Sequence, residues 1–241
     1  MNKELIQKRF AKNLSTYNEN AKIQKRMAEK LVSLSDRTSF DNILEIGCGT
    51  GFLTEQALKN FTFNTYTAND IVGGCEDYIL TLSDKIKFIQ ADIEEVIKNS
   101  GKKYDLIISN AAFQWIENLE IFLENLISKL NKGGLLLFST FGRENLHEIF
   151  QITGKTLNYK SCEEYDSILK NIPHFIEEEI QVLAFKSPKD VLKHLKYTGV
   201  NAIDSAAWTK ADMINFESRY KTICSASPTL TYNPIYIKIA H

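Results

Sequence analysis

ILEIGCGTG, residues 43–51, joins a run of apolar residues to a loop with glycine at positions 47, 49 and 51. The apolar run is typical of a buried parallel strand, and FLTEQALKN (52–60), which follows, has the length of a helix. A glycine-rich turn between a strand and a helix lies where an open α/β sheet binds ligands, beyond the carboxyl ends of its strands. This stretch therefore predicts an α/β fold with a ligand site at the glycine loop.

The spacing of Gly47, Gly49 and Gly51 limits the ligand that the loop can hold. A dinucleotide fingerprint, GxGxxG, would need its third glycine at position 52, where the chain has Phe52. The pattern is instead GxGxG, and the acid Glu45 precedes it. We interpret the loop as poorly matched to a pyrophosphate and suited to a smaller cofactor with a cationic tail. The alternative is a tight turn that binds nothing.

Further apolar runs alternate with helix-length stretches up to residue 141. LEIFLENLISKL (119–130) carries an apolar stripe, and the Asn-Lys-Gly-Gly sequence at 131–134 is expected to end that helix with a left-handed glycine. Strand, helix and strand repeated in this way predict a parallel sheet with helices on both faces. The additional predicted strands are residues 63–70, 85–92, 104–110 and 134–141.

Two later runs differ from these strands, because neither has a crossover helix immediately before it. They are IEEEIQVLAF (176–185) and LTYNPIYIKIA (230–240). Antiparallel strands do not need such a crossover. We therefore expect the two runs to pair antiparallel at the edge of the sheet.

The composition argues against several classes of protein. The 241 residues are 44% apolar and 24% charged, which suits one globular domain, and a formal net charge of −1 argues against wholesale nucleic-acid binding. The four cysteines are scattered without a CxxC pair, as expected in a reducing cytoplasm. The charged N-terminus shows no secretory signal, and no stretch reaches the ~20 apolar residues of a membrane span. We expect a cytoplasmic protein with no metal site.

Two acids end the next predicted strands. Asp70 ends residues 63–70, where an acid can accept hydrogen bonds from both hydroxyls of a ribose. Asp92 ends residues 85–92 and is placed to accept a hydrogen bond from an adenine amino group. Either acid alone is more often a helix N-cap. Taken with the glycine loop, the pair indicates a nucleoside site.

These features together resemble the class I S-adenosylmethionine-dependent methyltransferases. The stretches that carry the resemblance are LEIGCGTG (44–51), Asp70, ADIE (91–94) and ISNAAFQW (108–115). The resemblance implies a Rossmann-like, seven-stranded, mostly parallel sheet whose last two strands form an antiparallel edge.

The same resemblance implies a role for each matched residue toward S-adenosylmethionine. The glycine loop would cradle the methionine moiety, Asp70 would bind the ribose, and Asp92 the adenine. Asn110 would lie beside the sulfonium. The predicted cofactor-binding residues are Glu45, Gly47, Gly49, Gly51, Asp70, Asp92, Ile93 and Asn110.

A resemblance that spans nearly the whole chain is to the malonyl-acyl-carrier-protein O-methyltransferases of biotin synthesis. It rests on RFAKNLSTYNENAKIQKRMAEKL (9–31), SNAAFQWIENLE (109–120), FGRENLHEI (141–149), LKHLKYTGVNA (192–202) and SPTLTYNPIYIKIA (227–240). It implies methylation of the free carboxylate of a malonyl thioester on an acyl carrier protein. The chain departs from many relatives at GGCEDYI (73–79), which leaves the geometry near Asp70 open.

A nucleic-acid substrate is disfavoured by the residues that end the fourth predicted strand. DNA amino-methyltransferases place Asp/Asn-Pro-Pro-aromatic there to grip a flipped base. Residues 110–113 are Asn-Ala-Ala-Phe, without either proline. A small-molecule or protein-bound acceptor fits this sequence better.

Five residues are candidates for the catalytic site: Tyr17, Asn110, Gln114, Trp115 and Arg143. Asn110 to Trp115 would form one wall of a dry pocket, with Tyr17 on a lid over it. Arg143 would grip the acceptor carboxylate, because a guanidinium can bind a carboxylate bidentately. The alternatives are core packing for the aromatic residues, a surface helix for Tyr17 and a solvated loop for Arg143.

Positive charge is concentrated in two places. Residues 1–30 hold eight basic and three acidic side chains, a local excess of five. Lys189, Lys193 and Lys196 fall on one face of a predicted helix, 188–197. Acyl carrier proteins are acidic, so either stripe could dock one, although a solvated lysine face is the alternative.

We expect one methyltransferase domain over residues 1–241. Residues 1–35 would form an N-terminal helical lid, 40–141 the cofactor-binding core, and 142–241 the helices and edge strands on the substrate side. Two other functions stay open: methylation of a small free carboxylic acid or other metabolite, and a non-catalytic nucleoside-binding module.

Overall fold

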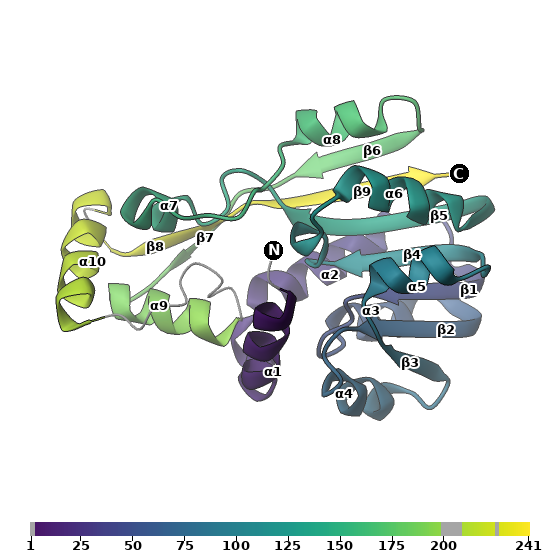
Figure 1. Ribbon diagram of the computed structural model, residues 1–241, viewed down its shortest axis with the longest axis horizontal. Helices are drawn as coiled ribbons and strands as arrows, with labels where there is room; N and C mark the ends of the chain where they lie inside the picture. The colour runs from purple at the N-terminus through teal and green to yellow at the C-terminus, as the bar shows by residue number, and fades with distance from the viewer. Residues whose placement is uncertain (1–2, 199–208, 225–226) are drawn as a thin grey trace.

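The computed structural model describes residues 3–198, 209–224 and 227–241 (Figure 1). Within these ranges seven strands form one sheet in the order β3-β2-β1-β4-β5-β9-β6, and β7 pairs with β8 in a separate sheet. The strands are β1 (Ser39–Ile46), β2 (Thr62–Asp70), β3 (Ile86–Gln90), β4 (Tyr104–Asn110), β5 (Leu130–Phe141), β6 (His174–Glu178), β7 (Gln181–Ala184), β8 (Thr229–Tyr232) and β9 (Pro234–Ala240). The helices are α1 (Lys3–Asn20), α2 (Lys22–Ser33), α3 (Phe52–Asn60), α4 (Cys75–Leu82), α5 (Ile93–Asn99), a 3-10 turn η1 (Phe113–Trp115), α6 (Leu119–Ser128), α7 (His147–Thr153), α8 (Cys162–Leu169), α9 (Pro188–Tyr197) and α10 (Lys210–Ile223).

The pairing of the strands confirms the predicted fold class. β1 to β5 are all parallel to one another, whereas β9 runs antiparallel to both β5 and β6. The two late runs pair antiparallel as expected, but each is split in two. β6 and β9 complete the main sheet, and β7 and β8 continue beyond it as a two-stranded ribbon.

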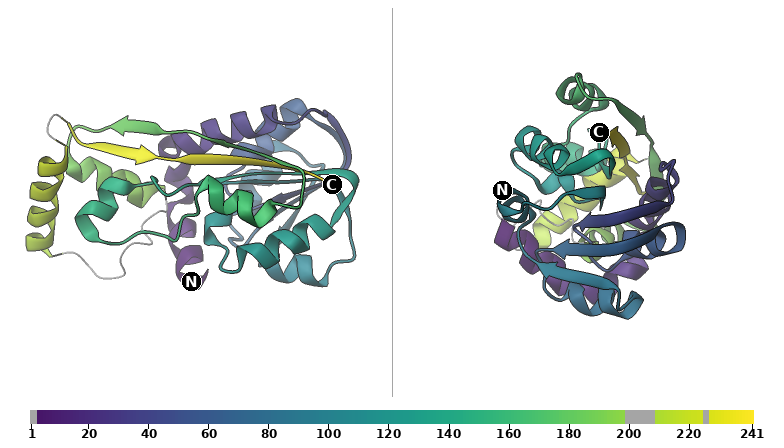
Figure 2. Two further views of the ribbon diagram at one scale, coloured as in Figure 1. Left: turned by 90° about the horizontal axis from the view of Figure 1, so that it is seen from above. Right: turned by 90° about the vertical axis from the view of Figure 1, so that its right-hand side faces the viewer.

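Helices cover both faces of the main sheet (Figure 2). On one face α2, α3 and α4 bury Met27, Leu53 and Ile79 in the core. On the other face α5 and α6 bury Ile97 and Leu126. Each fully buried side chain of this size contributes about 1.5–3 kcal/mol. Stability therefore comes from the two layers, while the carboxyl ends of the strands stay available for a site.

The end of α6 differs from the sequence-based prediction. The helix ends at Ser128, and Leu130 already lies in β5, where it pairs with Tyr104. Gly133 does adopt a left-handed φ of 74°, but it turns the backbone near the start of β5. Its N–H donates to the His241 carbonyl at 2.7 Å. The prediction that residues 131–134 cap the helix is thus wrong. The left-handed backbone at Gly133 instead allows its hydrogen bond with His241.

Helix α1 stands apart from the layers and has no fully buried residue. It lies across the end of the sheet in Figure 1. Lys3 at its start pairs with Asp92 at 2.7 Å, and the Gln7 amide donates to the Ile71 carbonyl at 2.8 Å. α1 is therefore held over the loops that follow β2 and β3.

Candidate active site at the strand ends

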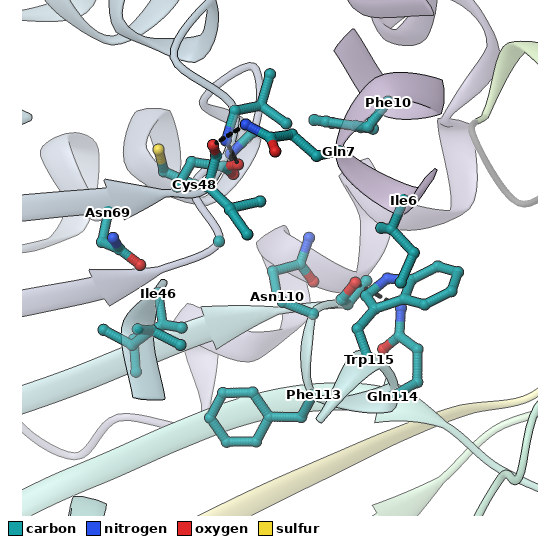
Figure 3. Close-up of a pocket in the computed structure, with 18 of the residues that line it drawn as sticks. Ile6, Gln7, Phe10, Ile46, Cys48, Asn69, Asn110, Phe113, Gln114 and Trp115 are labelled. Atoms are coloured by element: carbon teal, nitrogen blue, oxygen red, sulfur yellow. Dashed lines mark hydrogen bonds between the residues drawn. The ribbon is translucent and has the colours of Figure 1, made fainter. Parts of the chain in front are cut away.

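A cavity of about 200 Å³ lies at the carboxyl ends of β1, β2, β3 and β4 (Figure 3). Its wall also includes residues of α1 and α2. The predicted site residues found in the wall are Tyr17, Gly47, Gly49, Asp70, Asp92, Ile93, Asn110, Gln114 and Trp115. The structure therefore brings together groups that are spread over about a hundred positions of sequence.

The glycine loop after β1 has two different reasons for its glycines. Gly49 has a φ of 53°, and a Cβ there would lie 3.3 Å from the ring of Phe10. Gly47 has a φ of 66°, and a Cβ there would lie only 2.7 Å from the Cβ of Ala112. Packing against the end of β4 thus requires glycine at position 47, whereas Gly49 keeps the backbone accessible at the cavity.

Asp70 lies beside this loop with both oxygens engaged by the backbone. Oδ2 accepts the Gly49 N–H at 2.9 Å, and Oδ1 accepts the Val72 N–H at 2.9 Å. Burial raises the pKa of Asp70, and these backbone donors act in the opposite direction. A carboxylate oxygen can accept more than one hydrogen bond, so both oxygens can still accept from a ribose hydroxyl.

Asp92 combines the two roles considered from the sequence. It accepts the Glu94 N–H at 3.1 Å and so caps the N-terminus of α5. It also lines the cavity, where its other oxygen pairs with the Lys3 ammonium. The adjacent Ile93 presents an apolar surface to the same space. An acid beside an apolar wall suits a purine with an exocyclic amino group.

Asn110 holds the ends of two elements together. Its Nδ2 donates to the Gln24 carbonyl of α2 at 2.9 Å, and its Oδ1 accepts from Ser139 Oγ at 2.6 Å. The next residue, Ala111, has a φ of 53°, which costs an L-residue about 1–2 kcal/mol. Strain of this kind is retained where it fixes the geometry of a site.

The aromatic residues after Asn110 serve different purposes. Phe113 is buried and stacks on Phe138 with centroids 4.6 Å apart, so it belongs mainly to the core. The Gln114 amide donates to the Ala111 carbonyl at 2.6 Å and fixes the turn. Trp115 is half-buried and faces the cavity close to Gln114 (Figure 3).

Tyr17 enters the cavity from α1. Its ring packs edge-on against Phe10 at 5.0 Å and lies 5.9 Å from Phe52, which follows the glycine loop. Burial raises the pKa of Tyr17, so the phenol is a neutral hydroxyl. α1 therefore contributes both an aromatic wall and a polar group above the loop.

Comparison with known proteins agrees with this geometry. A family model for a methyltransferase domain matches residues 17–201. The chain is 39% identical to a malonyl-acyl-carrier protein O-methyltransferase of Calditerrivibrio nitroreducens, over 96% of this chain and 94% of the relative. It is 36% identical to the same enzyme of Chlorobium luteolum, over 97% and 94%. The chain belongs to the malonyl-acyl-carrier protein O-methyltransferase family.

Solved structures share the fold of this methyltransferase at much lower identity. The YcgJ protein of Bacillus subtilis superposes with a TM-score of 0.64 at 9% identity, covering 89% of this chain and 97% of that one. The N-methyltransferase NodS of Bradyrhizobium japonicum, solved in complex with S-adenosyl-L-homocysteine, gives a TM-score of 0.51 at 16% identity, over 90% and 86%. These likenesses support the Rossmann-like fold alone.

Two predicted cofactor residues of the methyltransferase lie outside the cavity wall. Glu45 is completely buried behind the loop, where it accepts hydrogen bonds from the Tyr66 hydroxyl at 2.5 Å and from Thr54 at 2.7 Å. Gly51 is the N-cap of α3, and a Cβ there would lie 2.6 Å from Leu82 Cδ1. The structure thus gives both residues a part in supporting the loop.

Arg143 is also outside the wall, although Phe141, two residues earlier, lines the cavity. Its guanidinium lies 3.0 Å from Glu164, and 63% of its side-chain surface is exposed. The structure therefore places Arg143 at the surface near the cavity, already paired with an acid.

Several wall residues of the methyltransferase had no predicted role. They include Lys3, Ile6, Gln7, Phe10, Gln24 and Thr198. Phe10 and Gln24 fall within the stretch 9–31 that carries the family resemblance, and Gln24 is also a polar residue on the apolar face of α2. No local pattern located Lys3, Ile6, Gln7 or Thr198, because the start of α1 and the residue after α9 reach the cavity only through the tertiary fold.

The described part of the chain contains neither a cluster of metal ligands nor a helix that could span a membrane. No three side chains among His, Cys, Asp and Glu are grouped there in a way that could hold a metal ion. None of its helices has the length and apolar character needed to cross a bilayer.

Proposed function

We propose that this methyltransferase uses S-adenosylmethionine to methylate the free carboxylate of a malonyl thioester on an acyl carrier protein, as an early step of biotin synthesis. The observation that carries the proposal is the shared cavity. It joins two acids suited to a nucleoside, Asp70 and Asp92, to a polar and aromatic wall at Asn110 and Trp115. The names of the full-length relatives support the choice of acceptor.

The residues at the strand ends fit the proposed cofactor. Gly49 keeps the backbone open at the cavity, where the methionine moiety would lie, and Asp70 would accept hydrogen bonds from the ribose. Asp92 and Ile93 would flank the adenine. Glu45, which is buried behind the glycine loop, would support the loop without contacting the cofactor. When bound, the cofactor supplies an electrophilic methyl group on a sulfonium.

The acceptor chemistry explains why the cavity needs no general base. A carboxylate with a pKa near ~4 is already ionised at neutral pH. The protein has to align its oxygen with the methyl carbon and to remove water from it. Asn110, Gln114 and Trp115 would form the wall beside the reacting atoms, while Tyr17 on α1 excludes water from above.

Arg143 would act at the rim of this cavity. Its present partner, Glu164, is a surface acid, and exposed ion pairs are weak enough to exchange. In this proposal the guanidinium leaves Glu164 and binds the acceptor carboxylate as the substrate enters. Glu164→Gln should therefore preserve or lower the KM for the acceptor, whereas Arg143→Ala should raise it.

The carrier protein would approach over the basic side chains of α2 and α9. Lys22, Lys25 and Arg26 are exposed on α2, and Lys196 is exposed on α9. α1 packs against α9 and leads directly into α2, which places the start of α2 near α9. Burial and the charge on Lys22 together lower the pKa of His194 in α9 to about 4. The two stripes predicted from the sequence would then form one docking surface. An enzyme with four free cysteines suits the cytoplasm, where acyl carrier protein is found.

In this proposal, three successive segments of the chain have different roles. Residues 1–35 would form the lid, 40–141 the cofactor core, and 142–241 the substrate side. Residues 1–2, 199–208 and 225–226 of these segments lie outside the described residues.

The deciding experiment is incubation with S-adenosylmethionine and malonyl-carrier protein, followed by intact mass spectrometry. We expect a gain of one CH2 that a mild esterase removes. Acetyl-carrier protein, which lacks the free carboxylate, is the matched control and should gain nothing. Methylation of free malonyl thioesters but not of the carrier-bound form would replace this proposal with a small-acid methyltransferase. Tight cofactor binding without turnover on any acceptor would indicate a binding module.

A further inference from the structure

Gln24 is a polar side chain placed where α2 otherwise packs apolar groups. Only 4% of its surface is exposed, and it is preceded by Ile23 and followed one turn later by Met27 and Ala28, all buried. Burying an amide without hydrogen bonds is unfavourable, yet the Gln24 amide atoms are not among the fully buried side-chain atoms that lack a partner, so they reach the cavity that this residue lines.

The side-chain amide of Gln24 has no hydrogen-bond partner within the part of the chain that the structure describes, and it lines the cavity. Its backbone is held firmly, because the Gln24 carbonyl accepts from Asn110 Nδ2 at 2.9 Å. Asn110 is in turn fixed by Ser139 at 2.6 Å. The backbone of Gln24 is therefore fixed beside the end of β4, and its side-chain amide has N–H donors and an oxygen acceptor available to a ligand.

The charges around the cavity restrict what this group can meet. Among the described wall residues, the charged side chains are Lys3, Asp70 and Asp92. All three lie at the nucleoside end, where Lys3 is paired with Asp92. The wall around Asn110 and Gln24 is uncharged. Within the cavity, a carboxylate bound at that end would therefore meet neutral N–H and O–H donors, and the cation proposed for the acceptor, Arg143, lies outside the wall.

We propose that the Gln24 side-chain amide donates a hydrogen bond to a ligand carboxylate at the Asn110 end of the cavity. Two ligands of the proposed reaction carry one: the amino-acid tail of the cofactor and the acceptor. A neutral amide can donate a hydrogen bond to either carboxylate, and for the acceptor it would act inside the cavity while Arg143 acts at the rim. This inference rests on the proposed function for the identity of both ligands.

The test uses the full-length protein and Gln24→Leu, which keeps the approximate size of the side chain and removes its donors. Calorimetry measures binding of two probes, S-adenosylhomocysteine and methylthioadenosine, the second of which lacks the amino-acid tail. If the amide holds the cofactor tail, affinity for S-adenosylhomocysteine falls at least tenfold and affinity for methylthioadenosine stays within twofold. If it holds the acceptor, both affinities stay within twofold and the KM for the malonyl thioester rises at least tenfold.

Two additional variants separate this role from a structural one. Gln24→Glu keeps the shape of the side chain but repels a carboxylate. Whichever quantity changes in Gln24→Leu, the affinity for S-adenosylhomocysteine or the KM for the malonyl thioester, should therefore change at least as much in Gln24→Glu. Gln7→Leu alters the nucleoside end and should weaken both probes equally. Equal loss of both probes in Gln24→Leu would overturn the inference, and so would unchanged affinities and KM in a folded variant. The binding measurements do not require turnover, so they remain decisive for the cofactor tail even if the proposed methyl transfer fails.

Discussion

The carboxylate of Asp70 accepts the backbone N–H of Gly49 at 2.9 Å, across the gap between the loops that follow β1 and β2. The residue predicted to bind the ribose therefore also holds the glycine loop in place. Its other oxygen accepts from Val72, so the carboxylate is oriented before any ligand arrives. Such preorganisation reduces the entropy lost on binding.

Replacing Asp70 should weaken cofactor binding more than removal of one ligand contact would. We expect Asp70→Ala to reduce affinity for S-adenosylhomocysteine by ~1.5–3 kcal/mol, through lost charged hydrogen bonds to ribose. Asp70→Asn should lose less, because its amide oxygen can still accept from Gly49. Calorimetry checks this, with exposed Asp84→Ala as the control. Unchanged affinity in a folded Asp70→Ala protein would remove this acid from the site.

The contact between Lys3 and Asp92 should affect how long the cofactor stays bound. Lys3 pairs with Asp92 and Glu94 and closes α1 over the nucleoside end of the cavity. We expect Lys3→Ala to raise the release rate of S-adenosylhomocysteine roughly two- to fivefold, a modest effect because the pair is partly exposed. Stopped-flow release kinetics measure it. Lys8→Ala, on the exposed side of α1, is the control and should leave the release rate unchanged.

Tyr17 offers a test of the lid that separates packing from hydrogen bonding. Tyr17→Phe keeps the ring contacts with Phe10 and Phe52 and removes only the hydroxyl. We expect it to lower kcat/KM roughly tenfold, the value of one buried hydrogen bond to substrate, without changing the melting temperature. Tyr17→Ala should reduce turnover much further by admitting water. If Tyr17→Ala retained full activity, α1 would not be a lid.

Glu45 should make stability depend on pH. Burial raises its pKa from 4.5 to about 7, and one of its oxygens, Oε1, has no hydrogen-bond partner among the residues that the structure describes. Because the folded protein binds this proton more tightly than the unfolded chain, the free energy of unfolding falls as pH rises from about 4.5 to about 7. Glu45→Gln should remove this decline, a difference on the order of 2–3 kcal/mol between pH 5 and pH 8. Urea unfolding at both pH values measures this, with exposed Glu120→Gln as the control. If the interpretation is wrong, the free energy of unfolding will change with pH equally in the wild type and in Glu45→Gln.

The basic stripes should matter only for a protein-bound acceptor. Neutralising Lys189, Lys193 and Lys196 together should slow methylation of malonyl-carrier protein and spare a small malonyl thioester. The wild-type rate with carrier protein should also fall as salt rises, since the Debye length is ~8 Å at physiological ionic strength. Lys189 and Lys193 already pair with Glu217 and Asp190, so we expect Lys196 to contribute most. Rates unaffected by these changes and by salt would exclude docking through α9.

The corresponding variants of α2 test the other half of the same surface. Lys22→Ala, Lys25→Ala and Arg26→Ala change exposed side chains, but Lys22 also acts on His194. Cofactor affinity measured in parallel shows whether the lid has been disturbed.

Local sequence patterns determined the core of the fold and located part of the wall of the cavity. Apolar runs predicted β1 to β5, and α3 and α9 begin and end at the predicted residues. The glycine loop, Asp70, Asp92 and Asn110 lie at the ends of strands or within the loops just after them, and parallel strands bring their carboxyl ends to one edge. The end of α6 was mispredicted, since the glycine at 133 belongs to a contact with His241 at the far end of the chain.

Only the tertiary structure decided which residues close the cavity. Lys3 meets Asp92 across 89 positions of sequence, and Asn110 meets Gln24 across 86. It also placed Arg143 against Glu164 and put Glu45 behind the loop. A local pattern records which face of an element is apolar, but the partner of that face depends on how the helices pack over the sheet. Contacts between such distant residues arise only when the whole chain has folded.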